Sequence, residues 1–283
     1  MSRIKVWVVV VILLCVAAAA GWRLLRPPAT PHPPGTPQPI VVHAKGPFLD
    51  DRLRGALLAE LQPVALTNCE LKRFGEANDG GYVLCANLLG AVQAGYSYGI
   101  SGYDGWGCQV SRELKIKVHQ YDCFELDEPV CPGGATTFHA ECVAGEPSTN
   151  DDRLFDTPEH QIARNGDARR QLVVKIDVEG AEWDTFLETP DSVFDQIDQL
   201  AIEFHGANRQ RYADAIAKLK RHFYVANLHF NNYSCTAGLE PFPAWAYEVL
   251  LVSKRLGVPD PSGKRPDLSA VNAPNNPMAP DCQ

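Results

Sequence analysis

The chain has 283 residues, of which 45% are hydrophobic, so it holds enough apolar material for one large domain with appendages. This composition excludes disorder along the whole chain. The formal net charge is −8 and no long run of Lys or Arg occurs, so nucleic acid is not an expected partner.

An unbroken apolar run from Val6 to Trp22 lies near the N-terminus, between basic residues on both sides. Its length approaches the roughly 17 to 25 residues that cross a bilayer core. The small residues 17–20 also fit a signal-peptide cleavage site, but Trp22, Arg23 and Arg26 favour an uncleaved anchor over residues 6–25. The basic residues within 1–5 predict a cytoplasmic N-terminus. We therefore expect a single-pass membrane protein with its body outside the cytoplasm, in the Golgi or ER lumen of a eukaryote or on the periplasmic side of a bacterium.

Two segments flank the predicted folded domain. Residues 26–45 contain PPATPHPPGTPQP, which is typical of an extended, proline-rich stem. Residues 257–283 are rich in Pro and Asn and lack apolar periodicity, which predicts a disordered tail. The folded domain is then expected over residues 46–256.

Within that domain, apolar runs alternate with amphipathic ones, as in α/β folds with a parallel sheet. Leu53, Leu57 and Leu61 predict an opening helix. Strands are expected at 95–100, 116–121, 136–143, 172–176, 200–204, 223–229 and 247–252.

Eight cysteines follow the apolar run, from Cys69 to Cys282. An even count in an extracytoplasmic body favours disulfides, and no C-x-x-C pair typical of zinc is present. Cys69 and Cys85 flank the turn-rich segment 73–82, and we expect them to pair. The alternative is a cytosolic domain with buried free thiols. The triplet Asn232-Tyr233-Ser234 is a glycosylation sequon.

Glycines follow the first predicted strand. The run Tyr98-Gly99-Ile100-Ser101-Gly102 lies where open α/β sheets bind cofactors, although such a run is also common in ordinary turns. Asp122 ends the next predicted strand, where a carboxylate can accept hydrogen bonds from ribose hydroxyls. A simple strand-end cap is the alternative for Asp122.

Acidic residues follow the strand at 172–176. Asp177, Glu179 and Glu182 are close in sequence, and clustered like charges indicate a ligand or a metal. Glu182 can alternatively favour the dipole of the helix that begins there. His205 ends the strand at 200–204, and a neutral imidazole there is a candidate base for a hydroxyl proton. A histidine bonded to backbone is the alternative, and the histidine spacing predicts no metal site.

The segments KIDVEGAEW (175–183) and QLAIEFHG (199–206) resemble the FkbM-type methyltransferases and related methyltransferase-like proteins of membrane and secretory systems. The likeness extends over residues 69–254 and includes Arg73-Phe74-Gly75, Asp79-Gly80-Gly81-Tyr82 and YSYGISG. It implies a Rossmann-like class I methyltransferase fold, with a mostly parallel seven-stranded sheet whose last strand is antiparallel.

The resemblance also implies S-adenosylmethionine as the cofactor. Gly99, Ser101 and Gly102 would lie along its methionine and ribose parts, Asp122 would hold the ribose, and the stretch 139–144, which contains Val143, would border the adenine. Ser97 departs from the family pattern, because many members have an acidic residue there.

The function expected is O-methylation of a saccharide or another small hydroxyl-bearing acceptor, with Asp177, Glu179 and His205 as catalytic residues. Two alternatives stay open. In a stem-anchored glycosyltransferase, Asp177 and Glu179 would bind a metal for a nucleotide sugar. In a non-catalytic binding module, only the fold would remain.

Overall fold

The computed structural model describes residues 51–282. The predicted cytoplasmic N-terminus (1–5), anchor (6–25) and stem (26–45) lie outside the described residues. Within 51–282, no helix combines the length and apolar character needed to cross a membrane.

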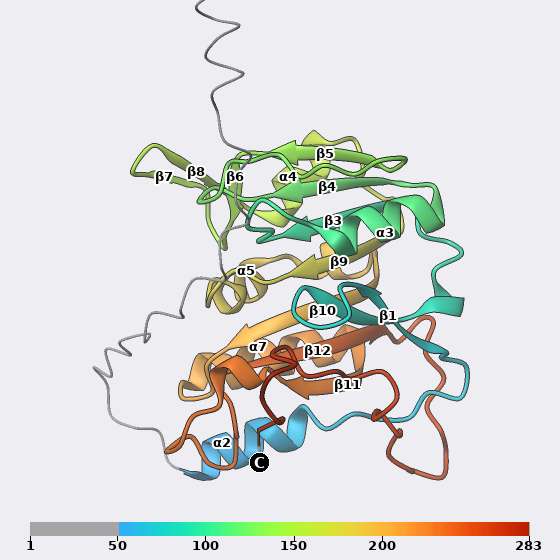
Figure 1. Ribbon diagram of the computed structural model, residues 1–283, viewed down its shortest axis with the longest axis vertical. Coiled ribbons are helices and arrows are strands. Elements are labelled where there is room, and N and C mark those ends of the chain that lie inside the picture. Colours follow the sequence, from blue (N-terminus) through green and yellow to red (C-terminus); the bar gives the residue numbers. More distant parts are fainter. Residues whose placement is uncertain (1–50, 283) are drawn as a thin grey trace, which may run out of the picture. The chain divides into compact units, whose positions relative to one another are not determined.

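Seven strands form one sheet in the order β11-β12-β10-β9-β3-β4-β5 (Figure 1). Neighbouring strands are parallel, except that β12 runs antiparallel to both β10 and β11. This confirms the expected mostly parallel sheet with a reversed last strand, which is compatible with a Rossmann-like fold. The strands are β3 (Ala94–Tyr98), β4 (Lys117–Tyr121), β5 (Ala135–His139), β9 (Leu172–Ile176), β10 (Ile197–His205), β11 (Phe223–Phe230) and β12 (Ala246–Ser253).

The strand order changes direction between β3 and β9. From β3 the chain adds β4 and β5 on one side, and then crosses back to place β9 and β10 on the other. Loops leaving the carboxyl ends of β3 and β9 therefore diverge, and open α/β sheets bind ligands at such a point.

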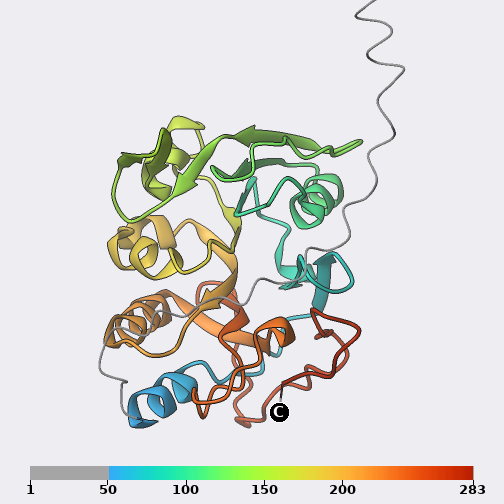
Figure 2. The ribbon, with the colours of Figure 1, turned by 60° about the vertical axis from the view of Figure 1, so that its left-hand side comes forward.

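Helices cover one face of the sheet, and α3 with a small hairpin covers the other (Figure 2). The first face carries α4 (Pro158–Arg164), α5 (Glu182–Glu188) and α7 (Gln210–His222), with α2 (Asp51–Glu60) beside α7. The second carries α3 (Gly105–Leu114) and the hairpin of β1 (Leu71–Gly75) and β2 (Gly81–Cys85). The remaining elements are α6 (Asp191–Phe194), β6 (Glu141–Val143), β7 (Ser148–Asn150), β8 (Arg153–Asp156) and two short 3-10 turns at 86–88 and 232–234.

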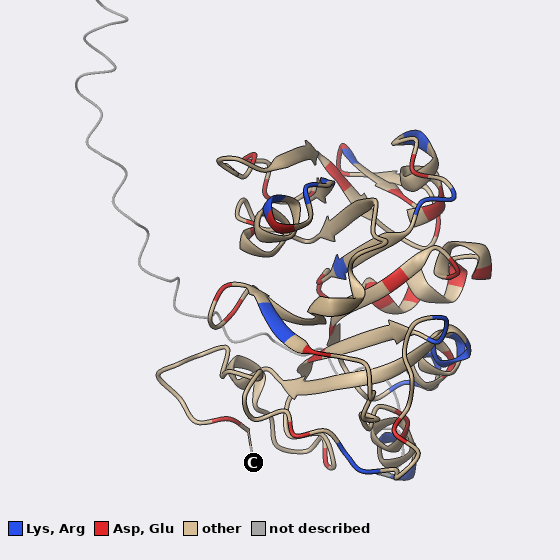
Figure 3. Ribbon diagram, turned by 90° about the vertical axis from the view of Figure 1, so that its right-hand side faces the viewer, with Lys and Arg blue, Asp and Glu red and all other residues tan. Residues whose placement is uncertain are grey.

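The apolar run of β9 explains its central place. Leu172, Val174 and Ile176 belong to the core under α5 and α7, whereas Val173 belongs to the core under α3 and the hairpin. A strand buried on both faces is continuously apolar. The strands of the sheet are correspondingly poor in charged residues (Figure 3).

The third predicted strand, 136–143, is divided in the structure. β5 ends at His139, and Glu141–Val143 form β6, which pairs with β8 in a separate three-stranded sheet with β7. The local sequence TTFHAECV does not reveal a change of sheet. The short, exposed β7 has no apolar alternation to mark it.

All eight cysteines between residues 69 and 282 are paired. The Cys69–Cys85 bond confirms the predicted pairing, and the others are Cys108–Cys131, Cys123–Cys142 and Cys235–Cys282. Four disulfides fit an oxidising, extracytoplasmic environment.

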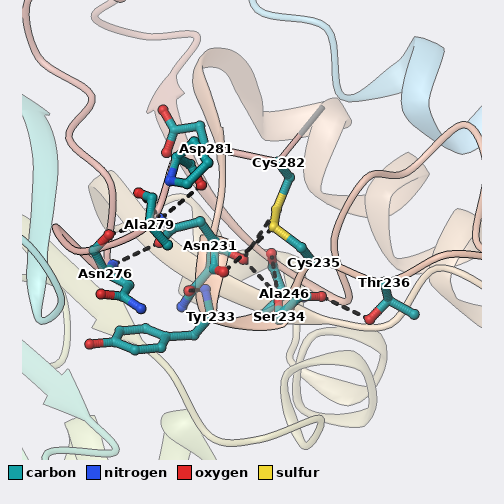
Figure 4. The surroundings of a disulfide bond; sticks show 12 residues. Asn231, Tyr233, Ser234, Cys235, Thr236, Ala246, Asn276, Ala279, Asp281 and Cys282 are labelled. Carbon is teal, nitrogen blue, oxygen red and sulfur yellow. Dashed lines mark hydrogen bonds between the residues drawn. A yellow bond between two sulfur atoms is a disulfide. The ribbon is translucent and has the colours of Figure 1, made fainter.

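The C-terminal segment differs from the predicted disordered tail. Through residue 282 it forms no helix or strand, but Cys282 is bonded to Cys235, as Figure 4 shows. The buried Asn275 side chain donates to the carboxylates of Glu248, at 2.7 Å, and Asp79, at 3.0 Å. These polar contacts hold the segment against the body, and apolar periodicity cannot predict them.

The sequon asparagine lies beneath this segment. Asn232 is buried, and its amide nitrogen donates to the carbonyls of Asn276, Ala279 and Pro280 at 3.0–3.2 Å. A glycan on Asn232 is therefore incompatible with the folded tail.

Candidate functional site

A pocket of about 510 Å³ lies at the carboxyl ends of β3, β4 and β9. Its volume falls within the range of small-molecule sites, roughly 300–1,000 Å³. The structure brings six of the eight predicted site residues to its wall, while Gly102 and His205 lie outside the lining. The six are Gly99, Ser101, Asp122, Val143, Asp177 and Glu179.

The loop after β3 lies directly against the end of β9. Gly99 has φ +71°, and a Cβ on it would be 1.6 Å from the Asp177 carbonyl oxygen, so only glycine fits. The buried Lys175 ammonium donates to the carbonyls of Tyr98, at 3.2 Å, and Gly99, at 2.6 Å. A lysine within an apolar strand thus fixes the glycine loop.

Asp122 connects the two loops that follow β3 and β4 in the pocket wall. One carboxylate oxygen accepts from the backbone N–H groups of Ile100 and Ser101, and the other from those of Phe124 and Glu125, at 2.8–3.1 Å. Burial by itself would raise the pKa of Asp122, but these four N–H groups lower it. Both oxygens are already engaged, so the geometry gives Asp122 a positioning role and does not support the predicted bond to a ribose.

Residues just beyond Asp122 also line the pocket, although they were not predicted as site residues. Glu125 brings a further carboxylate, and Phe124 brings an apolar ring that is 72% exposed. Phe155, from β8, faces the same space as Val143. Phe124 and Glu125 could have been predicted as site residues, because they come immediately after a carboxylate at the end of a strand. Phe155 could not, because β8 was not recognised.

Glu179 lies on a strained turn at the edge of the pocket. Its φ is +55°, a left-handed conformation that is costly for a residue other than glycine. Its side chain is 80% exposed, with one oxygen 3.6 Å from His205 Nε2. The carboxylate is therefore accessible to a ligand in the pocket.

A second group of polar side chains lies beside the pocket and shares Asp177 with it. Ligand atoms of Asp177, Glu203 and His205 all lie within 4.8 Å of one another. Tyr82, from β2, donates to Asp177 at 2.9 Å, and Asn231 donates to Glu203 at 2.8 Å. Between residues 51 and 282, Asp177, Glu203 and His205 form the one group of His, Cys, Asp and Glu side chains placed closely enough to hold a metal ion.

His205 is enclosed by carboxylates. Its Nδ1 is 3.1 Å from Glu182, whose own carboxylate accepts from the backbone N–H groups of Val178 and Gly180. Burial alone would lower the pKa of His205, but Glu182 and the other carboxylates raise it to about 10. A protonated imidazole cannot accept a proton, so this geometry does not favour the predicted role of His205 as a base.

Comparison of the chain with protein-family models and with curated proteins gives no match. Function is therefore inferred from the chemistry of the site.

Proposed function

We propose that this chain is an S-adenosylmethionine-dependent methyltransferase that acts on a hydroxyl group of a saccharide or another small acceptor. The observation that carries the proposal is the chemistry of the pocket wall. It combines four carboxylates with apolar side chains, and no Lys or Arg is among its described lining residues. The carboxylates are those of Asp122, Glu125, Asp177 and Glu179.

This lining fits a nucleoside that carries positive charge. S-adenosylmethionine has a sulfonium and an ammonium group, which acidic side chains attract, and an adenine, which apolar side chains accept. Phe124, Val143 and Phe155 would border the base, and Glu125 has a carboxylate suited to ribose hydroxyls. The strand order and the reversed β12 also agree with the fold that the resemblance implies.

When bound, the cofactor supplies a methyl group that an acceptor oxygen takes as it loses its proton, leaving a neutral thioether. The chain's own residues would place the two reactants and remove that proton. We assign proton removal to Glu179, because its carboxylate is exposed at the pocket edge. Asp177 would hold the acceptor or the positive charge beside it.

The same proposal includes the location. The four disulfides agree with a catalytic domain outside the cytoplasm. The apolar run at 6–22 would then anchor the chain with its N-terminus in the cytoplasm.

Calorimetric titration of the purified full chain tests the proposal against the glycosyltransferase alternative. We expect S-adenosylmethionine to bind at one site per chain and nucleotide sugars to give no heat, because their phosphates would meet carboxylates. Binding of a nucleotide sugar without binding of S-adenosylmethionine would replace the proposal. Binding of neither would favour a non-catalytic module.

A further inference from the structure

Sheet register places acidic side chains in a row at the end of the central strands. Glu203 on β10 lies directly opposite Glu248 on β12, and Glu248 lies opposite His229 on β11. On the other side of β10, Ile202 pairs with Ile176, so Asp177 follows next to Glu203. Like charges opposite one another in a sheet are destabilising, and Glu203 and Glu248 are both buried.

Among the described residues, Lys and Arg side chains meet only part of this row. Lys175 is 3.5 Å from one oxygen of Asp177, and Arg73 is 3.8 Å from Glu248. The other oxygen of Asp177 and one oxygen of Glu203 face the His205 ring. A divalent cation in this space would bring more positive charge to the row than the protonated His205 ring does.

The Nε2 nitrogen of the His205 ring faces that space. The His205 side chain is only 6% exposed, and Nε2 lies 3.6–3.9 Å from oxygens of Glu179, Asp177 and Glu203. These separations exceed the 2.7–3.2 Å of an N–H···O hydrogen bond. They match ligands that share one ion, since atoms about 2.1 Å from a metal lie roughly 3.0–4.2 Å from each other.

We propose that Asp177, Glu203 and His205 bind a divalent cation of the Mn²⁺ class, which takes the place of the proton on His205 Nε2 and releases that proton to solvent. Two carboxylates and one imidazole form a mixed oxygen and nitrogen donor set. Mn²⁺ accepts such a set, whereas Mg²⁺ prefers ligands that are all oxygen. Each ligand has a supporting partner: Glu182 fixes the His205 ring through Nδ1, Tyr82 donates to Asp177, and Asn231 donates to Glu203.

The position of the ion would connect it to the pocket. Asp177 belongs both to this cluster and to the pocket wall, so remaining coordination positions would be available to an acceptor oxygen. A cation there would lower the pKa of the bound hydroxyl and ease proton loss to Glu179. This role rests on the proposed function, whereas the binding of the ion does not.

The test is a titration of the metal-stripped full chain with Mn²⁺. Calorimetry measures the binding, and electron paramagnetic resonance detects any coupling between the bound Mn²⁺ and a ligand nitrogen. We expect one Mn²⁺ per chain and a nitrogen coupling from His205. Glu203→Gln and His205→Gln should weaken binding at least about tenfold, and His205→Gln should abolish the coupling. Glu125→Gln, which changes a pocket carboxylate outside the cluster, should bind Mn²⁺ like the unaltered chain.

Failure of the unaltered chain to bind Mn²⁺ below about 1 mM would overturn the site, whatever the variants do. An equal loss in Glu125→Gln would also overturn it, because it would show general attraction to an acidic pocket. Thermal unfolding and non-reducing peptide mapping would establish that each variant is folded. If the chain binds Mn²⁺ but not S-adenosylmethionine, the proposed function is wrong and the metal site stands. If it binds S-adenosylmethionine but not Mn²⁺, the metal site is wrong and the proposed function stands.

Discussion

Carboxylates around the pocket have two kinds of environment. Those of Asp122 and Glu182 are engaged by backbone N–H groups and shape the loops after β3, β4 and β9. Asp177 and Glu179 instead lie in the pocket wall, and the Glu179 side chain is 80% exposed. We therefore expect substitutions of the first kind to change the fold locally and those of the second kind to change the chemistry.

Asp122→Ala should lower the free energy of unfolding by roughly 2–3 kcal/mol, because four backbone N–H groups lose a charged acceptor. Affinity for S-adenosylmethionine should fall with it, since the loops at 100–101 and 124–125 would lose their common support. Denaturant unfolding under non-reducing conditions measures the first effect. Unchanged stability would show that the positioning role is wrong.

Glu179→Gln should lower the rate of methyl transfer by about a hundredfold or more while the cofactor dissociation constant changes less than about threefold. The reason is that the amide keeps the size of the side chain and loses the proton acceptor. Turnover at saturating cofactor and equilibrium binding, compared on one preparation, measure the two quantities. A large loss of affinity with an unchanged rate would place Glu179 at the cofactor instead.

Among the elements, the C-terminal segment depends most on contacts that are distant in sequence. It reaches the body through Cys235–Cys282 and the buried Asn275, although it contains no helix or strand up to residue 282. Hydrogen bonds from Asn275 to Glu248 and Asp79 connect it to the acidic row.

Replacing both Cys235 and Cys282 by Ser should destabilise the chain by up to about 4 kcal/mol, because the bond closes a loop with a sequence separation of 47. Removing Cys69–Cys85, with a separation of 16, should cost about 3 kcal/mol on the same basis. Denaturant unfolding of the two double variants compares them. Equal stability of the Cys235/Cys282 variant and the unaltered chain would show that this disulfide does not stabilise the fold.

Buried strands of the sheet were predictable from the sequence, and short exposed ones were not. β9 and β10 are buried over their whole length and were expected close to their observed positions, whereas β7 and β8 are short and partly exposed. Gly99 and Asp177 could be placed near one another because parallel strands end at the same edge. The partners of Asp122 and His205 could not, because hydrogen-bond geometry leaves no periodic pattern.

At the scale of the whole molecule, the buried polar groups make stability depend on pH. His119, inside β4, is 3.0 Å from His139 and 3.3 Å from Asp167. Burial lowers the pKa of His119 from 6.5 to about 4, although Asp167 acts in the opposite direction. At a pH between about 4 and 6.5, His119 is therefore protonated in the unfolded chain and neutral in the folded chain.

Stability should therefore fall as the pH is lowered from 6.5 towards 4, by at most roughly 3 kcal/mol from this group. Unfolding free energies at pH 7 and pH 4.5 measure the change, and His119→Gln should make it smaller. An identical pH dependence in the variant would assign the effect to other groups.

The proposed function is tested most directly by whether the pocket beside Asp177 holds S-adenosylmethionine. Ala181 lies in the pocket wall, so Ala181→Trp should obstruct it, whereas Glu159→Trp adds the same ring to an exposed position on α4 outside the lining. The unaltered chain and Glu159→Trp should bind the cofactor equally in equilibrium titrations, and Ala181→Trp, still folded, should lose at least about a hundredfold in affinity. Equal binding by all three chains would contradict the proposed function.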